Sequence, residues 1–516
     1  MIEMTLREIA EIVGGTLHDV SDPAVTVTGA VEFDSRRINS GDLFLALPGE
    51  HADGHDYADR AVAAGAVAVL AARPVGVPAV VVEPFGPAAE AGSNRSYVLA
   101  HDSDGSAAAV LAALAKLARA SVDRLAAGGL TVVGVTGSAG KTSTKDLLAR
   151  VLEPHGAVVA PPGSFNNELG HPWTALRAGP DSRFLVLELS ARGPGHIKAL
   201  TEIAPPRIGV VLNVGTAHLG EFGGRDAIAQ AKGELVEALP ESGVAVLNAD
   251  DPRVAAMATR TRARVVTYGQ SADADVRATD IVLDSDARAR FTLHANGSRE
   301  QVQLAVHGEH QIANALAAAA VALECGADLA TVARSLAGAT VDSAHRMDVR
   351  TRPDGVTVVD DSYNANPDSM RAALKALVSM SGSGGTPAVP RGRRSWAVLG
   401  EMAELGEESV VEHDRIGRLA VRLDVDRLIV VGTGRPARAL HQGAVMEGSW
   451  GEESILVPDI ESAIAVLDNE IAAGDVVLVK ASNSAGLWAV ARHVLASGPQ
   501  SVTQGPSTEA GTEAAG

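Results

Sequence analysis

The chain has 516 residues, of which 46% are hydrophobic and 21% charged, a composition typical of a soluble globular protein of about three domains. Its 63 acidic and 44 basic residues give a net charge of −19 without a basic stripe, which argues against a nucleic-acid-binding surface. The single cysteine, Cys325, excludes an internal disulfide framework and a multi-cysteine zinc site. The sequence shows no export signal and no apolar run of membrane-spanning length, so we expect a cytoplasmic protein without membrane insertion.

The first part of the chain predicts a mixed α/β domain over residues 1–106. Short Val- and Ala-rich runs (VTVTGAVEFD, DLFLALPG, AVAVLAA and AVVVE) alternate there with the helix-like segment ADRAVAAGA. The stretch GSAAAVLAALAKLARASVDRL follows with helical spacing. We therefore expect a linker helix over 107–130 that leads into the next domain.

A parallel sheet is predicted over residues 131–341. The buried-strand runs are TVVGVTG, FLVLEL, IGVVLNV and GVAVLNAD, and helices are expected to begin near Lys141, Asn167, Arg225 and Asp251. A β-rich patch over 275–306 and the helix QIANALAAAAVALE complete this domain.

A further α/β domain is predicted over residues 342–498. Its strands are VTVVDDS, SWAVLGEM, RLIVVG and DVVLVKAS, and SGSGGTPAVPRGRR is expected to be a turn-rich surface loop. The tail over 499–516 is poor in apolar residues and is predicted to be disordered.

The segment TVVGVTGSAGKTSTKDLLARVL predicts a phosphate-binding loop between a strand and a helix. Glycines allow the backbone to wrap around phosphate oxygens, and N–H groups at a helix start favour anionic ligands. In such a loop Lys141 would reach the β- and γ-phosphates and Thr142 would hold Mg²⁺. Val135 stands where the strict pattern requires glycine, so the prediction depends on the strand–loop–helix context.

Polar residues at the ends of two other strands suggest a magnesium site beside this loop. Glu188 ends the run FLVLELS, and IGVVLNVGTAHLGEFGG places Asn213 and His218 beyond the next strand. Ligands of parallel sheets bind at the carboxyl ends of the strands, where a carboxylate suits a Mg²⁺ near ATP. A solvated strand-end charge at Glu188 and a structural role for His218 are the alternatives.

Only seven of the 44 basic residues are lysines, and most of them are expected to be ordinary. From its own amphipathic helix, RDAIAQAKGELVEAL, Lys232 is expected to be exposed and paired with Glu234 or Glu237. Lys480, after the strand VVLV, is a candidate for the phosphate or substrate side. The residues expected on helix surfaces are Lys116, Lys145, Lys198 and Lys375.

Three weaker patterns favour structural roles. HADGHDY and HGEH lack a full set of metal ligands at suitable spacing, so turn or cap roles are expected. Cys325 is predicted to lie in the Ala-rich helix AAAAVALECGADL and is expected to be a small core residue.

Seven segments in this order resemble the Mur ligases, ATP-dependent amide-forming enzymes that build the peptide of peptidoglycan. They are GVTGSAGKTST, LELSARGPGHI, LNVGTAHLGEF, AQAKGEL, NADD, GEHQIANALAA and DDSYNANPDSM. Within the family, SFNNELGHPWTAL, DDSYNANPDSM and VLGEMAELGEESVVEHDRIG resemble the branch that adds D-alanyl-D-alanine. The chain departs from the usual pattern of the family at two places. Many relatives have Asn where this chain has Ala139, and the sequence of the segment LELSARGPGHI differs from the common one.

The resemblance implies an α/β fold with three domains. A central P-loop parallel-sheet ATPase domain would be flanked by an N-terminal mixed α/β UDP-binding domain and a C-terminal Rossmann-like domain. The third domain would close onto the ATP by a hinge rotation.

The resemblance also assigns roles to individual residues. The expected ATP-binding residues are Gly137, Ser138, Ala139, Gly140, Lys141, Thr142, Ser143, Asn314, Arg346 and Asp361. The expected catalytic residues are Lys141, Glu188, His218 and Lys232. Two Mg²⁺ ions would be held by Thr142, Glu188, His218 and Lys232, the last as a carbamate (N6-carboxylysine). Ser35 and Arg36 would lie on the uridine-nucleotide side, and Asn166 and Asn167 near the sugar-peptide.

The implied reaction joins D-alanyl-D-alanine to UDP-MurNAc-tripeptide through an acyl phosphate, with release of ADP and phosphate, by a monomeric enzyme. Two alternatives from the same superfamily are another amino-acid-adding Mur ligase and a folylpolyglutamate synthase-like ligase. An alternative from a different class is a nucleotide-switched binding module. That module would need only the phosphate loop, whereas this sequence adds Glu188, His218 and Lys232.

Overall fold

The computed structural model describes residues 1–49, 52–86, 99, 102–216, 219–340, 342–382, 393–448 and 454–498. The chain forms two compact units. The first contains residues 1–346 with 366–372 and 403–409, and the second contains 347–365, 373–402 and the chain from 410 onward. The tail over 499–516 and most of the predicted surface loop lie outside the described residues. No helix in the described ranges has the length and apolar character needed to cross a membrane.

The first unit begins with a small sheet in the order β2-β7-β6-β5-β4. Its strands are β2 (Thr16–His18), β4 (Val31–Glu32), β5 (Leu43–Leu45), β6 (Ala68–Ala71) and β7 (Ala79–Val81). All neighbours pair in parallel except β2 and β7. A two-stranded ribbon, β1 (Met4–Thr5) with β3 (Thr26–Val27), and the helices α1 (Leu6–Val13) and α2 (Ala58–Ala63) accompany it. The sequence therefore predicted a mixed α/β arrangement correctly.

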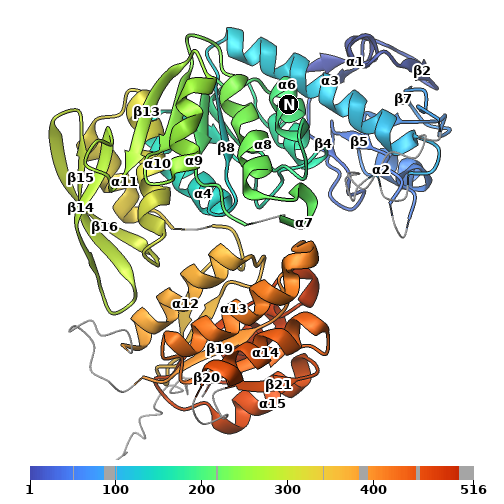
Figure 1. Ribbon diagram of the computed structural model, residues 1–516. Helices are drawn as coiled ribbons and strands as arrows, with labels where there is room; N and C mark the ends of the chain where they lie inside the picture. Colours follow the sequence, from blue (N-terminus) through green and yellow to red (C-terminus); the bar gives the residue numbers. More distant parts are fainter. Residues whose placement is uncertain are drawn as a thin grey trace, which may run out of the picture. The chain divides into compact units, whose positions relative to one another are not determined.

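The predicted helix after this sheet is α3 (Ser106–Ala127), which runs from the first sheet towards the central sheet (Figure 1). It packs against α1 on one side and against α5 and α6 of the central region on the other. One apolar core joins Leu43 of β5, Leu114 of α3 and Leu187 of β10. The first sheet and the central sheet are thus packed together through α3.

The central sheet has the order β16-β15-β14-β13-β12-β11-β8-β10-β9. Its parallel part comprises β8 (Thr131–Thr136), β9 (Ala157–Val159), β10 (Ser182–Glu188), β11 (Ile208–Val211), β12 (Val244–Asn248), β13 (Arg264–Gly269) and β14 (Val276–Leu283). The strands β15 (Arg288–Ala295) and β16 (Ser298–His307) continue it in antiparallel pairing. The predicted β-rich patch is therefore an antiparallel extension of this sheet.

Helices cover both faces of the central sheet, as its continuous apolar strands require. The helices are α4 (Lys141–Leu152), α5 (Gly170–Ala175), α6 (His196–Ile203), α7 (Leu219–Phe222), α8 (Arg225–Glu237), α9 (Pro252–Ala255), α10 (Gln311–Glu324) and α11 (Leu329–Gly338). Apolar residues of α4 and α10 pack with Val133 and Val135 of β8. On the other face, α6 and α8 pack with Val211 of β11.

The strand order places three sequence motifs together at the carboxyl ends of the parallel strands. β8 lies between β10 and β11, with Glu188 beside Val135 and Val211 beside Thr136. Because these strands are parallel, the segments that follow them leave the sheet at the same edge. The phosphate loop, Glu188 and the segment after Val211 therefore come together there.

The second unit is built on a sheet in the order β17-β18-β22-β19-β20-β21, parallel except for β17. Its strands are β17 (Asp348–Thr351), β18 (Thr357–Asp360), β19 (Ser395–Leu399), β20 (Arg427–Val431), β21 (Ser454–Val457) and β22 (Val476–Lys480). The helices in this part of the chain are α12 (Pro367–Ser381), α13 (Ser409–Arg422), α14 (Arg435–Glu447), α15 (Ile460–Glu470) and α16 (Trp488–Ala496). This arrangement confirms the predicted Rossmann-like domain.

Candidate functional site

The phosphate loop connects β8 to α4 over Gly137, Ser138, Ala139 and Gly140. Gly140 adopts a φ of 84°, a left-handed conformation that residues with a Cβ rarely adopt. A Cβ at this position would also lie 2.5 Å from the side-chain oxygen of Asn314. Backbone conformation and space therefore both require glycine at the last position of the loop.

The first turn of α4 is open to an anion. In the described part of the chain, no side chain caps this helix, so the N–H groups of Lys141, Thr142 and Ser143 lack the intrahelical partners that later residues have. The amine of Lys141 donates to the carbonyl oxygen of Gly137 at 2.8 Å. Burial lowers the pKa of this amine, while the Glu188 carboxylate opposes the shift. The arrangement suits phosphate oxygens.

Glu188 and Thr142 form the centre of a candidate cation site. The Thr142 hydroxyl lies 3.4 Å from Oε2 of Glu188, and Nδ2 of Asn166 donates to the same oxygen at 3.4 Å. The other carboxylate oxygen, Oε1, is buried and has no hydrogen-bond partner among the described residues. Burial raises the pKa of the Glu188 carboxyl, opposed first by the charge of Lys141. A buried carboxylate oxygen without a donor is a suitable ligand for Mg²⁺.

Lys232 lies on α8 and is buried, not exposed as its own helix suggested. Its predicted partners are engaged elsewhere: Glu234 accepts from the N–H groups of Gly195 and Lys198, and Glu237 pairs with Arg260 at 2.8 Å. The prediction failed because helical spacing does not reveal which face packs on the sheet. Burial, with the charge of Lys141 nearby, lowers the pKa of the Lys232 amine well below its usual value.

The predicted histidine ligand, His218, lies outside the described residues. Over the ranges given above, no three His, Cys, Asp or Glu side chains are close enough to hold a metal ion together. Mg²⁺ is commonly held by one or two carboxylates together with phosphate oxygens and waters, and the predicted ligands Thr142 and Lys232 would add a hydroxyl and a carbamate oxygen to Glu188.

Two of the predicted nucleotide contacts lie beside the loop. The Asn314 side chain accepts from the Thr144 hydroxyl at 3.2 Å and donates to Gln311 at 2.8 Å, next to Gly140. Arg346 donates to the Ser164 hydroxyl at 3.1 Å, and Ser164 is 2.6 Å from the Thr142 hydroxyl. A contact between Asn314 and adenine stays a prediction.

The third predicted nucleotide contact, Asp361, belongs to the second unit. Its carboxylate accepts from the buried Lys480 amine at 2.6 Å and from the N–H of Met347 at 3.2 Å. Lys480 also donates to the Asn364 carbonyl at 2.8 Å. Lys480 thus orients Asp361, a role that the sequence left open.

The predicted substrate-side residues belong to two segments that an aromatic cluster joins. Ser35 and Arg36 follow β4, where Arg36 pairs with Asp34 at 2.7 Å. Asn166 and Asn167 precede α5, and the side-chain oxygen of Asn167 accepts from the N–H of Gly170, the first residue of α5, at 2.8 Å.

The cluster consists of Phe33, Phe165 and Trp173, with ring centroids 5.7 Å (Phe33–Trp173) and 4.8 Å (Phe165–Trp173) apart. The Trp173 indole also donates to the carbonyl oxygen of Val31 in β4 at 2.9 Å. The sequence analysis did not predict this cluster. Because aromatic residues make up only 3% of the chain, their occurrence in these two segments could have drawn attention to it.

The weaker motifs have structural roles. In HADGHDY, Asp53 bonds the His55 ring at 2.6 Å, and the ring accepts from the N–H of Ala72 at 3.0 Å. In HGEH, His307 bonds the carbonyl oxygen of Asp286 at 2.7 Å. Cys325 is partly buried against the core, and burial raises the pKa of its thiol to about 11. The first two assignments are as predicted, and Cys325 packs as a small apolar residue.

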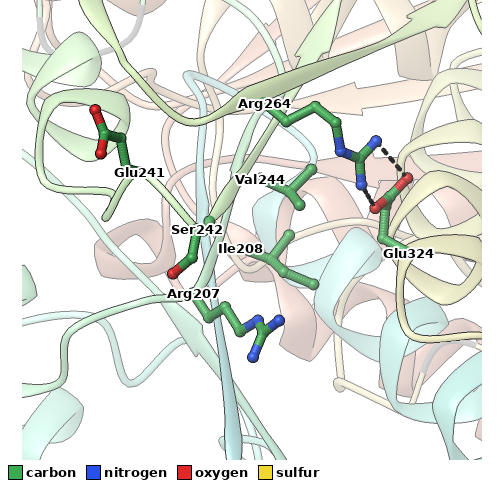
Figure 2. Close-up of a pocket in the computed structure, with 8 residues that line it drawn as sticks. Arg207, Ile208, Glu241, Ser242, Val244, Arg264 and Glu324 are labelled. Atoms are coloured by element: carbon green, nitrogen blue, oxygen red, sulfur yellow. Dashed lines mark hydrogen bonds and ion pairs between the residues drawn. The ribbon is translucent and has the colours of Figure 1, made fainter.

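A cavity of about 310 Å³ lies at the amino-terminal ends of the strands of the central sheet. Its lining includes Ile208, Val244 and Arg264, which begin β11, β12 and β13, whereas the phosphate loop follows a strand end. Figure 2 shows Arg264 facing Glu324, with which it forms an ion pair. The cavity therefore takes no part in the candidate site.

Known proteins resemble this chain over nearly its whole length. Three domain models match in order: Mur ligase family, catalytic domain, at residues 28–121; Mur ligase middle domain at 135–322; and Mur ligase, glutamate ligase domain, at 345–483. The chain is 61% identical over 510 residues to the UDP-N-acetylmuramoyl-tripeptide–D-alanyl-D-alanine ligase of Mycobacterium tuberculosis (strain ATCC 25618 / H37Rv), covering 96% of this chain and 98% of that protein. The chain belongs to the Mur ligase family.

A more distant relative of this Mur ligase has the same name, and two solved structures called MurF have the same fold. The ligase of that name from Escherichia coli (strain K12) is 32% identical over 496 residues, covering 95% of this chain and 98% of the relative. The crystal structure I of MurF from Acinetobacter baumannii matches with a TM-score of 0.79 at 28% identity, covering 96% and 99% of the two chains. MurF ligase from Thermotoga maritima, solved in complex with ADP, matches with a TM-score of 0.73 at 30% identity, covering 91% and 98%.

Proposed function

We propose that this Mur ligase joins D-alanyl-D-alanine to UDP-N-acetylmuramoyl-tripeptide at the expense of ATP, as the name of its mycobacterial relative states for that protein. The strongest support is the 61% identity to that ligase over 96% of the chain. The site contributes independently, because among the described residues it combines a helix start without a side-chain cap, a loop lysine and a buried carboxylate oxygen without a hydrogen-bond partner.

The reaction is proposed to proceed in two steps. The terminal carboxylate of the tripeptide attacks the γ-phosphorus of ATP, which breaks the bond to ADP and gives an acyl phosphate. The amine of D-alanyl-D-alanine then attacks the acyl carbon, loses a proton and displaces phosphate. Activation is needed because a carboxylate is a poor electrophile. The negative charge of the carboxylate repels the phosphates of ATP and opposes the first step.

The residues of the phosphate loop offset this repulsion. The first turn of α4 presents N–H groups to the phosphates, and the Lys141 amine, now bound to the Gly137 carbonyl, would reach the transferring group. Magnesium, when bound, supplies positive charge to the phosphate oxygens. The residues that fit it are Thr142, Glu188 and a carboxylated Lys232, with His218 as the further predicted ligand.

The carbamate at Lys232 is part of the proposal. A neutral lysine amine can add CO₂ and become an anionic oxygen ligand, which an arginine cannot do because it stays protonated. Burial favours the neutral amine at this position. A monomeric state and the number of Mg²⁺ ions stay predictions from the resemblance, and a cytoplasmic location stays a prediction from the sequence.

Phosphate release tests the proposal. Purified enzyme is incubated with ATP, UDP-MurNAc-tripeptide and one amine at a time: D-alanyl-D-alanine, diaminopimelate, lysine or glutamate. We expect release that requires both the tripeptide and D-alanyl-D-alanine, with the pentapeptide identified by mass. Release that does not depend on D-alanyl-D-alanine would contradict the assignment.

A further inference from the structure

Asn213 follows Leu212 after the end of β11 and pairs with the phosphate loop. Its side-chain oxygen accepts from the N–H groups of Ser138 at 2.9 Å and Ala139 at 3.0 Å. Its side-chain nitrogen donates to the carbonyl oxygen of Ala139 at 3.1 Å. The carboxamide thus bonds both polar groups of Ala139, as the backbone of a neighbouring strand would.

The segment that carries Asn213 is itself held on both sides. The carbonyl oxygen of Leu212 accepts from the Asn248 side chain at 2.8 Å, and the N–H of Val214 donates to Asp251 at 2.8 Å. The N–H of Gly215 donates to the Ser138 hydroxyl at 2.9 Å. The last residue of β12 and Asp251 after it therefore hold the segment from one side, and Ser138 of the phosphate loop holds it from the other.

We propose that Asn213 is a positioning residue for nucleotide binding, which holds Ser138 and Ala139 so that the first turn of α4 and Lys141 meet the phosphates. The inference rests on the proposed ATP-dependent function. It divides the loop into two parts: the N–H groups of Ser138 and Ala139 are bound by the protein itself. No described side chain caps the helix start, so the N–H groups of Lys141, Thr142 and Ser143 are left for the ligand.

The opposite interpretation is that Asn213 occupies the place of a phosphate oxygen and leaves when ATP binds. A phosphate oxygen can only accept, whereas the Asn213 side chain also donates to Ala139. Displacement would break that bond as well, while the N–H of Gly215 and the backbone carbonyl oxygen of Asn213 would still hold the segment beside Ser138. The two-way pairing therefore favours a permanent support.

Amide hydrogen exchange distinguishes the two interpretations without using catalysis. In nucleotide-free enzyme, we expect the amides of Ser138 and Ala139 to be protected already, and those of Lys141–Ser143 to become protected only when ADP is added. Fast exchange at Ser138 and Ala139 that ADP suppresses would overturn the inference, because the ligand would then take those N–H groups.

Two variants test the contribution to affinity. Asn213→Ala removes all three side-chain hydrogen bonds, and Asn213→Asp keeps the shape and the acceptors but removes the donor to Ala139. We expect each to raise the Kd for ADP about tenfold or more in direct titration. The KM for ATP should rise with it, and the affinity for UDP-MurNAc-tripeptide should stay unchanged.

Asn469→Ala is the matched control, since Asn469 is an exposed helix residue of α15 that bonds only its own helix in the described chain. Wild-type ADP affinity in both Asn213 variants would overturn the inference, even if their unfolding temperatures fall, because a merely structural role lowers stability alone. Failure of the unmodified enzyme to bind ADP would instead overturn the proposed function together with this inference.

Discussion

Burial gives the Lys232 amine a chemistry that the exposed lysines of this chain lack. Removal from water disfavours the ammonium form, and the nearby charge of Lys141 disfavours it further. Lys198, by contrast, is exposed on α6. Only a lysine that is neutral at working pH can add CO₂, so the environment of the residue decides its role.

Lys232→Met should lower the rate of phosphate release about a hundredfold or more, because it removes a proposed magnesium ligand. The unfolding temperature should not fall, since methionine fits a buried site without the cost of an unpaired amine. Enzyme equilibrated with ¹³C-bicarbonate should show a carbamate signal that Lys232→Met lacks and Lys198→Met retains. A variant with unchanged turnover would contradict the carbamate assignment.

At the level of residues, sequence patterns located the loop and Glu188 but not the contacts around them. The order strand–glycine turn–Lys141 fixes a local geometry, so Gly140 and Lys141 lie as predicted. Asn213 was recognised as a residue of the sheet edge, yet its pairing with Ala139 depends on β8 and β11 being neighbours in the sheet. No local pattern contains that information.

The helix α4 holds the end of the first unit as well as the phosphate loop. Lys145 was expected on the surface, but it is buried and forms an ion pair with Asp146. Its amine also donates to Pro161 at 2.9 Å and to the Ser343 hydroxyl at 3.2 Å. Asp146 accepts from the N–H of Ser343 at 3.2 Å. The ion pair thus fastens the segment around Ser343 to α4.

Lys145→Met should lower the free energy of unfolding by about 3 kcal/mol, because it leaves the Asp146 carboxylate buried without its partner. Adding Asp146→Asn should recover part of the loss, since asparagine carries no charge and still accepts from Ser343. Chemical denaturation followed by far-UV circular dichroism measures both. Lys375→Met, at an exposed position on α12, is the control and should change stability by about 0.5 kcal/mol or less. An equal change in unfolding free energy in Lys145→Met and Lys375→Met would disprove the role of Lys145.

Secondary structure was predicted best in elements whose apolar residues form a long run or recur at regular spacing. The buried strands β8, β10, β11 and β12 and the helix α10 lie where the sequence placed them. The short edge strand β9 and the terminal strand β21 were not predicted. Three or four residues at a sheet edge carry too few apolar positions to establish a period of two.

The whole first unit should lose stability in mild acid through His171. This imidazole is fully buried on α5; its Nδ1 lies 3.4 Å from the carbonyl oxygen of Glu188, and its Nε2 has no partner within the described residues. Burial lowers the pKa of His171 from 6.5 to about 4. The unfolded chain therefore binds a proton between these two pH values that the folded chain does not.

The stabilising contribution of neutral His171 is complete above pH 6.5 and is lost as the pH falls towards 4. The loss can reach about 3 kcal/mol. His171→Leu removes this titration, so its unfolding free energy should change less between pH 7 and pH 4.5 than that of the wild type. Parallel pH profiles of the two proteins would show that His171 does not titrate as proposed.

The core that α3 shares with both sheets of the first unit has a consequence for engineering. Leu43, Leu114 and Leu187 belong to one apolar cluster, although they come from the first sheet, α3 and the central sheet. A chimaera that exchanged only the N-terminal module with another ligase would bring together two halves of an interior that were never matched in shape. Successful recombination would have to transfer α3 and the facing side chains of β8 and β10 together with the module, so that the junctions fall on the surface of the protein.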